Sequence, residues 1–187
     1  MCRFAFICLF VFFSNMFPAF AVNELDTGAA CEKKVVSLIN KTQRTIDAAL
    51  YAINRKPIIN ALIAASQRGV RIRLLMDRTQ LGASKNLREL YQLLEAGVDL
   101  RVSKGKGLMH TKMAIFDRKT ISGGSFNWTN PAVTANDEIC NFFVNDLEYA
   151  AKHQKFFNRL WKKHPAQFSE KWFQNNGRCG DILLLRT

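Results

Sequence analysis

Hydrophobic and polar positions alternate with two different periods between residues 31 and 103. Segments with an apolar residue at every third or fourth position predict helices at about 32–42, 57–69 and 84–97. Short segments rich in β-branched and other apolar residues predict strands at 45–53, 70–77 and 98–103. Because these helices and strands alternate, we expect an α/β domain with a mixed β-sheet that is flanked by helices on both faces.

The second half of the pattern consists of consecutive strands followed by one long helix. The strands are predicted at 108–117, 120–126 and 138–144, and the helix runs from about Leu147 to Lys163. His110 and Lys112 fall two positions apart inside the first of these strands. Side chains alternate along a strand, so both polar groups are expected on the same face.

A hairpin is expected where this strand meets the next one. If Arg118 and Lys119 form a two-residue loop, Lys112 lies opposite Ser125 and His110 lies opposite Asn127. A loop with an odd number of residues would turn the second strand over and move its side chains to the other face. The glycines at 123 and 124 would let another backbone or a ligand approach closely.

The predicted patch combines an imidazole, an ammonium, a hydroxyl and an amide. Histidine serves as a nucleophile or a general acid near neutral pH. Lysine, serine and asparagine donate hydrogen bonds that stabilise an anion. Neither paired carboxylates nor a His/Cys cluster accompanies them, so we expect no metal ion. The chemistry favours a phosphate, with the histidine attacking phosphorus.

Composition and charge restrict the class of protein and of partner. The chain has 187 residues, 48% of them hydrophobic, which fits one globular domain and excludes a small disulfide scaffold or a disordered chain. Its formal net charge is +12. An excess of lysine and arginine favours polyanionic partners such as nucleic acid, anionic lipid headgroups or phosphorylated ligands, and the alternative is that the charge serves solubility alone.

The first residues have the features of a secretory signal peptide. Arg3 is followed by an apolar run, and Ala19-Phe20-Ala21 is a small-x-small cleavage pattern, so residues 1–21 are expected to be removed on export to the periplasm or beyond. An uncleaved anchor is the alternative, although Pro18 interrupts the run and no stable membrane span is expected. We divide the remainder into an N-terminal segment (22–30), a catalytic domain (31–164) and a C-terminal tail (165–187).

Three cysteines follow the predicted leader, and an exported protein meets an oxidising compartment. Cys31 and Cys179 flank the domain, so a disulfide joining its two ends is plausible. Free thiols and an intermolecular bridge remain open, and the role of Cys140 is left undetermined.

The polar residues also resemble a known motif. His110-x-Lys112-x4-Asp117-x6-Gly124-Ser125-x-Asn127 is similar to the HKD motif of the phospholipase D superfamily, and the chain looks most like its single-motif bacterial endonucleases of the Nuc type. The resemblance implies a phospholipase D-like domain that needs no metal or other cofactor. It also implies a role for each site residue: His110 as the nucleophile that forms a phosphohistidine, Lys112 and Asn127 on the phosphate oxygens, Ser125 in support, Asp117 in a structural role, and Glu138 orienting the histidine.

Enzymes of this superfamily use two such motifs, because one histidine attacks while the other protonates the leaving oxygen. This chain offers one motif: His153-x-Lys155 lacks the aspartate and the Gly-Ser-x-Asn that should follow. We therefore expect a homodimer with the active site on its two-fold axis, where each chain contributes one His110.

The motif leaves open which phosphodiester is cleaved. Lys104 and Lys106 precede the reactive segment, Arg78 ends another strand, and Gly124 allows a close approach, so these residues are candidates for substrate binding. They favour a nonspecific endonuclease acting on DNA or RNA. The alternative enzyme is a secreted phospholipase D that hydrolyses phosphatidylcholine-type lipids to phosphatidic acid, and a third possibility is a silent nucleic-acid-binding module. Trp128 can stack on a base or belong to the core.

Overall fold

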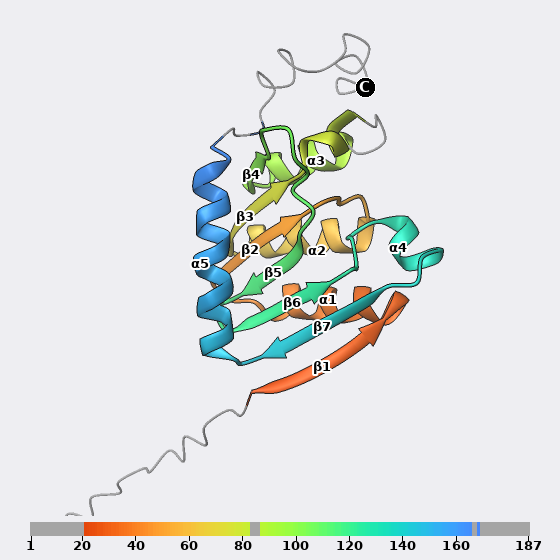
Figure 1. Cartoon of the computed structure of the whole chain (residues 1–187), viewed down its shortest axis with the longest axis vertical. Helices are drawn as coiled ribbons and strands as arrows, with labels where there is room; N and C mark the ends of the chain where they lie inside the picture. Colours follow the sequence, from red (N-terminus) through yellow and green to blue (C-terminus); the bar gives the residue numbers. More distant parts are fainter. Residues whose placement is uncertain (1–20, 83–86, 166–167, 169–187) are drawn as a thin grey trace, which may run out of the picture.

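A single mixed β-sheet forms the centre of the protein in a computed structural model that describes residues 21–82, 87–165 and 168 (Figure 1). The sheet has seven strands in the order β1-β7-β6-β5-β2-β3-β4. The predicted leader up to residue 20, Ser84, Cys179 and nearly all of the predicted tail lie outside the described residues. In the part of the chain that is described, no helix combines the length and the apolar character needed to cross a bilayer.

The sheet divides into a parallel and an antiparallel half. β2, β3 and β4 run parallel and are joined by helical crossovers, whereas β5, β6, β7 and β1 are antiparallel. The strands are β1 (Val22–Thr27), β2 (Thr45–Leu50), β3 (Arg71–Met76), β4 (Asp99–Val102), β5 (Lys112–Phe116), β6 (Thr120–Gly124) and β7 (Ile139–Val144).

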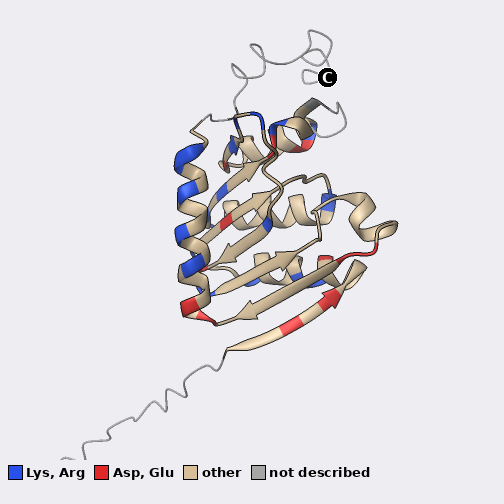
Figure 2. Ribbon diagram, viewed as in Figure 1, with Lys and Arg blue, Asp and Glu red and all other residues tan. Residues whose placement is uncertain are grey.

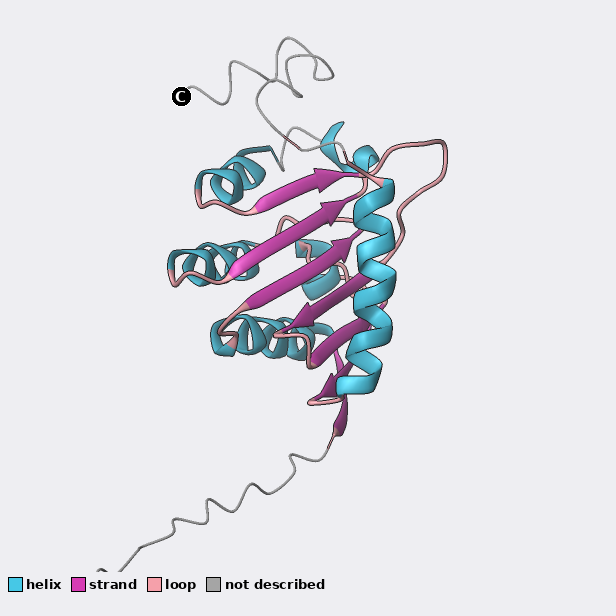
Figure 3. Cartoon of the chain, turned by 90° about the vertical axis from the view of Figure 1, so that its left-hand side faces the viewer, coloured by secondary structure: helices cyan, strands magenta, loops and turns pink. Residues whose placement is uncertain are grey.

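Helices cover both faces of the sheet, as the sequence predicts (Figure 3). The helices α1, α2 and α3 pack on one face, and α5 crosses the other face. Pro57 lies in the first turn of α2, where its missing N–H costs no helical hydrogen bond. The helices are α1 (Gly28–Lys41), α2 (Lys56–Gln67), α3 (Leu87–Glu95), α4 (Asn130–Thr134) and α5 (Leu147–Lys163), with a 3-10 turn at Arg78–Gly82.

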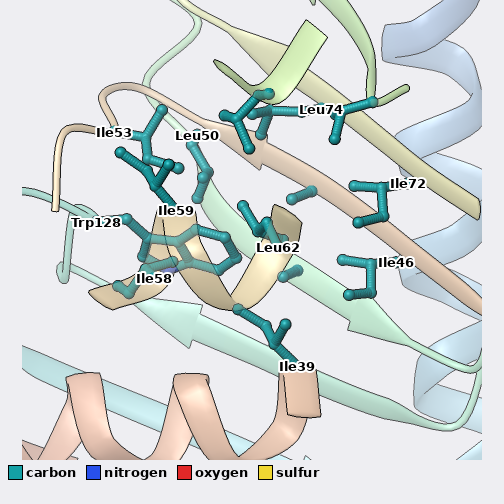
Figure 4. Close-up of a cluster of buried hydrophobic side chains, with 14 of the residues drawn as sticks. Ile39, Ile46, Leu50, Ile53, Ile58, Ile59, Leu62, Ile72, Leu74 and Trp128 are labelled. Atoms are coloured by element: carbon teal, nitrogen blue, oxygen red, sulfur yellow. The ribbon is translucent and has the colours of Figure 1, made fainter. Parts of the chain in front are cut away.

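The main hydrophobic core lies between the sheet and the face covered by α1 and α2. Ile46 and Leu50 of β2 and Ile72 and Leu74 of β3 point to this side, where they meet apolar side chains of the helices (Figure 4). Trp128 is only 2% exposed and belongs to this core, so it does not offer a free ring for stacking on a base.

A smaller core under α5 contains a buried ion pair that the sequence did not reveal. Asp47 of β2 accepts two hydrogen bonds of 2.7 Å from the guanidinium of Arg73 of β3, and a third of 2.7 Å from the amide of Gln154. The guanidinium of Arg73 lies over the rings of Phe157 and Trp161 of α5. The pairing satisfies a carboxylate that is 1% exposed and ties α5 to the sheet.

The hairpin between β5 and β6 differs from the prediction. β5 begins at Lys112, so His110 precedes the strand, and Phe116 pairs with Thr120 across a loop of three residues rather than two. The reason is Asp117, whose backbone N–H donates to Thr45 O and whose carboxylate accepts from the amides of residues 43–45. Asp117 is therefore held against the start of β2. The chain turns at Asp117 and Arg118, whose φ values are +49° and +57°, so Asp117 does not pair with Thr120 and the predicted register is wrong by one residue.

Residues 22–27 and 130–134 form elements that the hydrophobic pattern did not indicate, an edge strand and a short helix. β1 pairs with β7 and leads directly into α1, which places Cys31 over Cys140. These two residues form a disulfide with their Cα atoms 5.9 Å apart. The expected bridge between Cys31 and Cys179 is therefore wrong, because the β1–β7 pairing gives Cys31 a different partner.

Candidate functional site

The predicted reactive residues gather at one edge of the sheet, where β2 and β6 end and β5 and β7 begin (Figure 1). β5 enters the sheet beside the last residue of β2, since Lys112 pairs with Leu50. The contact continues one residue beyond both strands, where the amide of Tyr51 donates a hydrogen bond of 2.8 Å to Thr111 O. This pairing fixes the backbone at Thr111 and Lys112, directly after His110.

Tyr51 contacts both the imidazole and the ammonium of the motif. Its ring meets the His110 ring edge-on, with the centroids 4.8 Å apart, and the Lys112 Nζ lies 5.1 Å from its centroid. The Lys112 Nζ also donates to His110 O at 3.2 Å. The aromatic ring thus restricts both side chains, while the imidazole itself remains exposed to solvent.

Ser125 and Glu138 form the opposite side of the site. The hydroxyl of Ser125 donates to one oxygen of the Glu138 carboxylate and accepts a hydrogen bond of 3.1 Å from the amide of Ile139. The other carboxylate oxygen accepts from the amide of Asn136 at 2.9 Å. Glu138 is thereby fixed in orientation, and within the described residues it makes no hydrogen bond to His110 of its own chain.

Gly124 explains how the site forms despite the change in hairpin register. Its φ of +137° turns the chain out of the β6 ladder, and the amide of Ser125 then donates to Ile139 O at 3.0 Å. A Cβ atom at position 124 would lie 2.3 Å from Ile139 O, so only glycine fits there. The predicted close approach of another backbone is confirmed, and the chain turn rather than strand alternation directs Ser125 towards Glu138.

The electrostatics of Lys112 favour an anionic ligand. Partial burial lowers the pKa of Lys112 below its ordinary value, and the negative charge of Glu138 acts in the opposite direction. The burial contribution shows that the ammonium is incompletely solvated, and the Glu138 contribution shows that a carboxylate lies nearby. A phosphate bound beside it would supply negative charge where water is partly excluded, which favours the charged form of the lysine.

Asp77 holds the segment that presents His110. Its buried carboxylate accepts from the amide of Met109 at 2.6 Å, from the hydroxyl of Ser103 at 3.1 Å, and from the amide and the hydroxyl of Thr79 at 2.9 and 2.6 Å. Burial acts to raise the pKa of Asp77, but these hydrogen bonds outweigh it and hold the pKa below its ordinary value. Since the Met109 side chain is also buried under α5, the residue before the predicted nucleophile is anchored twice.

The remaining predicted residues occupy different positions. Asn127 follows Ser125 by two residues, and its amide oxygen is shielded from solvent without a hydrogen-bond partner among the described residues. Asp117 lies at the far end of β5, where hydrogen bonds to backbone amides overcome the effect of burial and lower its pKa. The side chains of Arg78, Lys104 and Lys106 are exposed.

The loop that carries Lys104 and Lys106 is held at its start by a second buried group. The Nδ1 atom of His164, the C-cap residue that follows α5, accepts a hydrogen bond of 3.0 Å from the amide of Lys104. Burial lowers the pKa of His164, with further contributions from the positive charges of Lys163 and Lys104. The neutral imidazole that this hydrogen bond requires is therefore favoured.

Tyr51 and Asp77 are the functional residues that sequence reasoning missed. Each follows the carboxyl end of a parallel strand, a position at which ligands commonly bind in α/β folds, and this placement was the available signal. No group of three or more His, Cys, Asp or Glu side chains arranged for a metal ion occurs among the described residues.

Comparison with known proteins shows what the chain resembles in sequence. Residues 35–161 match the family described as "Cardiolipin synthase, PLD-like domain". A phospholipase D from Rickettsia prowazekii is 33% identical over 141 residues, which cover 75% of this chain and 67% of the relative. A mitochondrial cardiolipin hydrolase from Chlamydomonas reinhardtii is 31% identical over 128 residues, covering 68% of this chain and 56% of the relative.

Solved structures show the same fold. Nuc from Salmonella typhimurium, a phospholipase D family member, superposes with a TM-score of 0.74 at 23% identity, covering 80% of this chain and 100% of that one. NucT from Helicobacter pylori gives a TM-score of 0.67 at 18% identity, with coverages of 80% and 100%.

Proposed function

The chain belongs to the phospholipase D superfamily, and from this premise we propose that it is a phosphodiester hydrolase whose nucleophile is His110. One observation carries the proposal: polar groups cluster at the strand ends around His110. The cluster consists of an exposed imidazole and a partly buried ammonium that both contact Tyr51, together with the hydrogen-bonded Ser125–Glu138 pair. These groups lie where one phosphate could contact both sides of the site. We infer that Lys112 and Asn127 bind its nonbridging oxygens and that Ser125 supports them.

The proposed reaction has two steps. A ring nitrogen of His110 forms a bond to phosphorus, the bond from phosphorus to the leaving oxygen breaks, and that oxygen takes a proton from a second histidine. Water then attacks the phosphohistidine, transfers its proton to the second histidine and releases the nucleophile. The other histidines of this chain are unsuited to the second role, since His153 contacts Tyr149 on α5 and His164 is buried.

We therefore propose a two-fold dimer in which His110 of the partner subunit is the general acid. The imidazole is exposed and directly precedes β5, where a second subunit could reach it, which supports this arrangement. Glu138 does not reach the histidine of its own chain, so the orienting role that the resemblance implies would be directed at the partner's His110.

Export is part of the same proposal. The predicted cleavage after Ala21 would leave β1 intact, because the strand begins at Val22. The Cys31–Cys140 disulfide supports an oxidising compartment, since such bonds are rare in the cytosol.

Among substrates we favour nucleic acid. The loop leading to His110 exposes Lys104 and Lys106, and the chain carries a net charge of +12, both of which suit a polyanionic backbone. The second candidate is a phospholipid, favoured by relatives named phospholipase D and cardiolipin hydrolase and by Leu108, which is 59% exposed in the same loop. An exposed leucine beside the site suits contact with acyl chains.

One set of assays distinguishes these possibilities. Mature protein in EDTA is given plasmid DNA, RNA, and vesicles of phosphatidylcholine or cardiolipin, with His110→Ala as the inactive control. Cleavage of nucleic acid that is weakened by Lys104→Ala with Lys106→Ala, but not by Leu108→Ser, supports the nuclease. Headgroup release that is lost in Leu108→Ser identifies the lipid enzyme, and binding without turnover of any substrate would overturn both.

A further inference from the structure

A second basic surface lies on α5 and the β5–β6 loop, and its lining includes none of the residues clustered around His110. Arg118 of the β5–β6 loop and three cations of α5, Lys155, Arg159 and Lys162, surround a hollow of about 580 Å³. All four side chains are exposed, and no acidic residue lines the hollow. Figure 2 shows the basic residues following one another along α5. We call this surface the α5 groove.

The floor of the α5 groove is held rigidly by the buried ion pair beneath it. Gln154, which lines the groove, donates to Asp47, and Asn158 accepts a hydrogen bond of 3.1 Å from Arg73. These bonds fix the rotation of α5 relative to the sheet. The three helix cations are therefore presented on one side before any ligand binds, which reduces the ordering cost of binding.

The spacing of the cations fits a phosphate backbone. Lys155, Arg159 and Lys162 are related by steps of four and three residues, so they share one helix face. At about 1.5 Å of rise per residue the row is roughly 10 Å long. One strand of duplex DNA presents a phosphate about every 3.4 Å, so the row spans about three phosphates.

We propose that the α5 groove binds the sugar–phosphate backbone of a duplex nucleic acid at a distance from the bond that is cut. No aromatic residue lines the groove, which argues against single strands that bind by base stacking. Its hollow shape, with no large exposed apolar side chain in the lining, argues against a membrane surface. That the bound duplex is also the substrate rests on the proposed nuclease function.

The distance between the two surfaces predicts a dependence on substrate length. β5 separates Lys112 from the loop that carries Arg118, and its five residues span roughly 15 Å. A duplex shorter than about five base pairs would not reach from Lys112 to the Arg118 end of the α5 groove. The groove should therefore affect binding of long duplexes and leave the chemical step on small substrates unchanged.

The test compares binding of a fluorescent duplex of about 20 base pairs by three proteins that all carry His110→Ala, so that cleavage cannot interfere. The first has no other change, and the second adds Lys155→Gln, Arg159→Gln and Lys162→Gln. The third is matched in charge and carries Lys33→Gln, Lys56→Gln and Arg88→Gln on the helices of the other face, where the three side chains are exposed. Anisotropy titrations between about 50 and 200 mM salt give the affinity and its salt dependence.

The groove variant should bind at least about tenfold more weakly at the lower salt, and the slope of log K against log salt should become shallower by about 2.7, or 0.9 for each lost contact. The charge-matched control should retain most of the affinity and most of the salt dependence. Equal losses in the two variants, or unchanged binding by the groove variant, would overturn the proposal. Binding to anionic vesicles is measured with the same three proteins. A groove variant that loses vesicle binding but keeps its affinity for duplex would also overturn the proposal.

Failure of the groove and failure of the proposed function remain distinguishable. With His110 intact, the groove variant should hydrolyse a small chromogenic phosphodiester at the wild-type rate. A wild type that cleaves no nucleic acid would refute the nuclease, whereas the anisotropy result would still decide whether the groove binds duplex. Loss of the small-substrate rate in the groove variant would contradict the separation of the two surfaces.

Discussion

Replacing Asp77 by asparagine tests whether a buried carboxylate positions the nucleophile. The change keeps the shape of the side chain but replaces one acceptor oxygen by an NH2 group. If the remaining oxygen stays on Thr79, the amide of Met109 faces a donor instead of the oxygen that now lies 2.6 Å away. An unsatisfied buried amide costs about 1–3 kcal/mol, so we expect the free energy of unfolding to fall by that amount.

The catalytic effect should exceed the effect of lost stability. Met109 immediately precedes His110, and a displacement of about 1 Å at a reacting group can reduce the rate about a hundredfold. We expect kcat on a small chromogenic phosphodiester to fall by about tenfold to a hundredfold, with a smaller change in KM. Urea unfolding of the same preparations gives the stability and shows that the protein is folded during the assay.

Asp117→Asn is the matched control. Asp117 also accepts several backbone amides and has a lowered pKa, but it lies at the other end of β5 from the site. Its replacement should cost a comparable free energy of unfolding and leave kcat per folded molecule nearly unchanged. The reasoning is refuted if Asp77→Asn retains wild-type kcat, or if both variants lose kcat equally.

The two carboxylates also predict how stability changes with pH. Each has a pKa in the folded protein below its ordinary value of 3.8, so each stabilises the fold above that pH. That contribution is lost as the pH falls from about 4 through the lower folded-state pKa, because the proton then binds the unfolded chain more tightly. Either asparagine variant should therefore show a shallower loss of stability on acidification than the wild type.

Four further perturbations test other parts of the structure. Replacing Cys31 and Cys140 by serine, or reducing their disulfide, should lower the free energy of unfolding by about 2–5 kcal/mol in urea titrations, because the bond closes a long loop; an unchanged midpoint would contradict the pairing. Gly124→Ala should reduce both stability and activity, since its Cβ would collide with the β7 backbone, and a fully active variant would show that the turn is not required. Arg73→Ala should cost about 3–5 kcal/mol by leaving a buried carboxylate unpaired, measured by thermal or urea unfolding. Mixing wild type with an excess of His110→Ala protein should suppress activity beyond simple dilution if the site is shared by two chains, whereas a linear response would argue for independent monomers.

The sequence alone determined the features that depend on neighbours along the chain. The period of its apolar residues predicted α5 with its observed ends at Leu147 and Lys163, and it indicated the alternation of helices and strands that gives a mixed sheet covered on both faces. The order of residues from His110 to Asn127 was enough to indicate the superfamily, which the comparisons bear out. Periodicity carries this information because burying one face of a helix or strand selects residues at fixed local spacing.

Only the tertiary structure decided which distant residues meet. The hairpin register depends on Asp117 binding amides of residues 43–45, and the cysteine pairing depends on β1 lying against β7. Tyr51 and Asp77 join the site because β2 and β3 end at the edge where β5 begins. Contacts between residues far apart in the chain are set by the competition of many possible pairings for the same backbone groups, and no local pattern records which pairing has the lowest free energy.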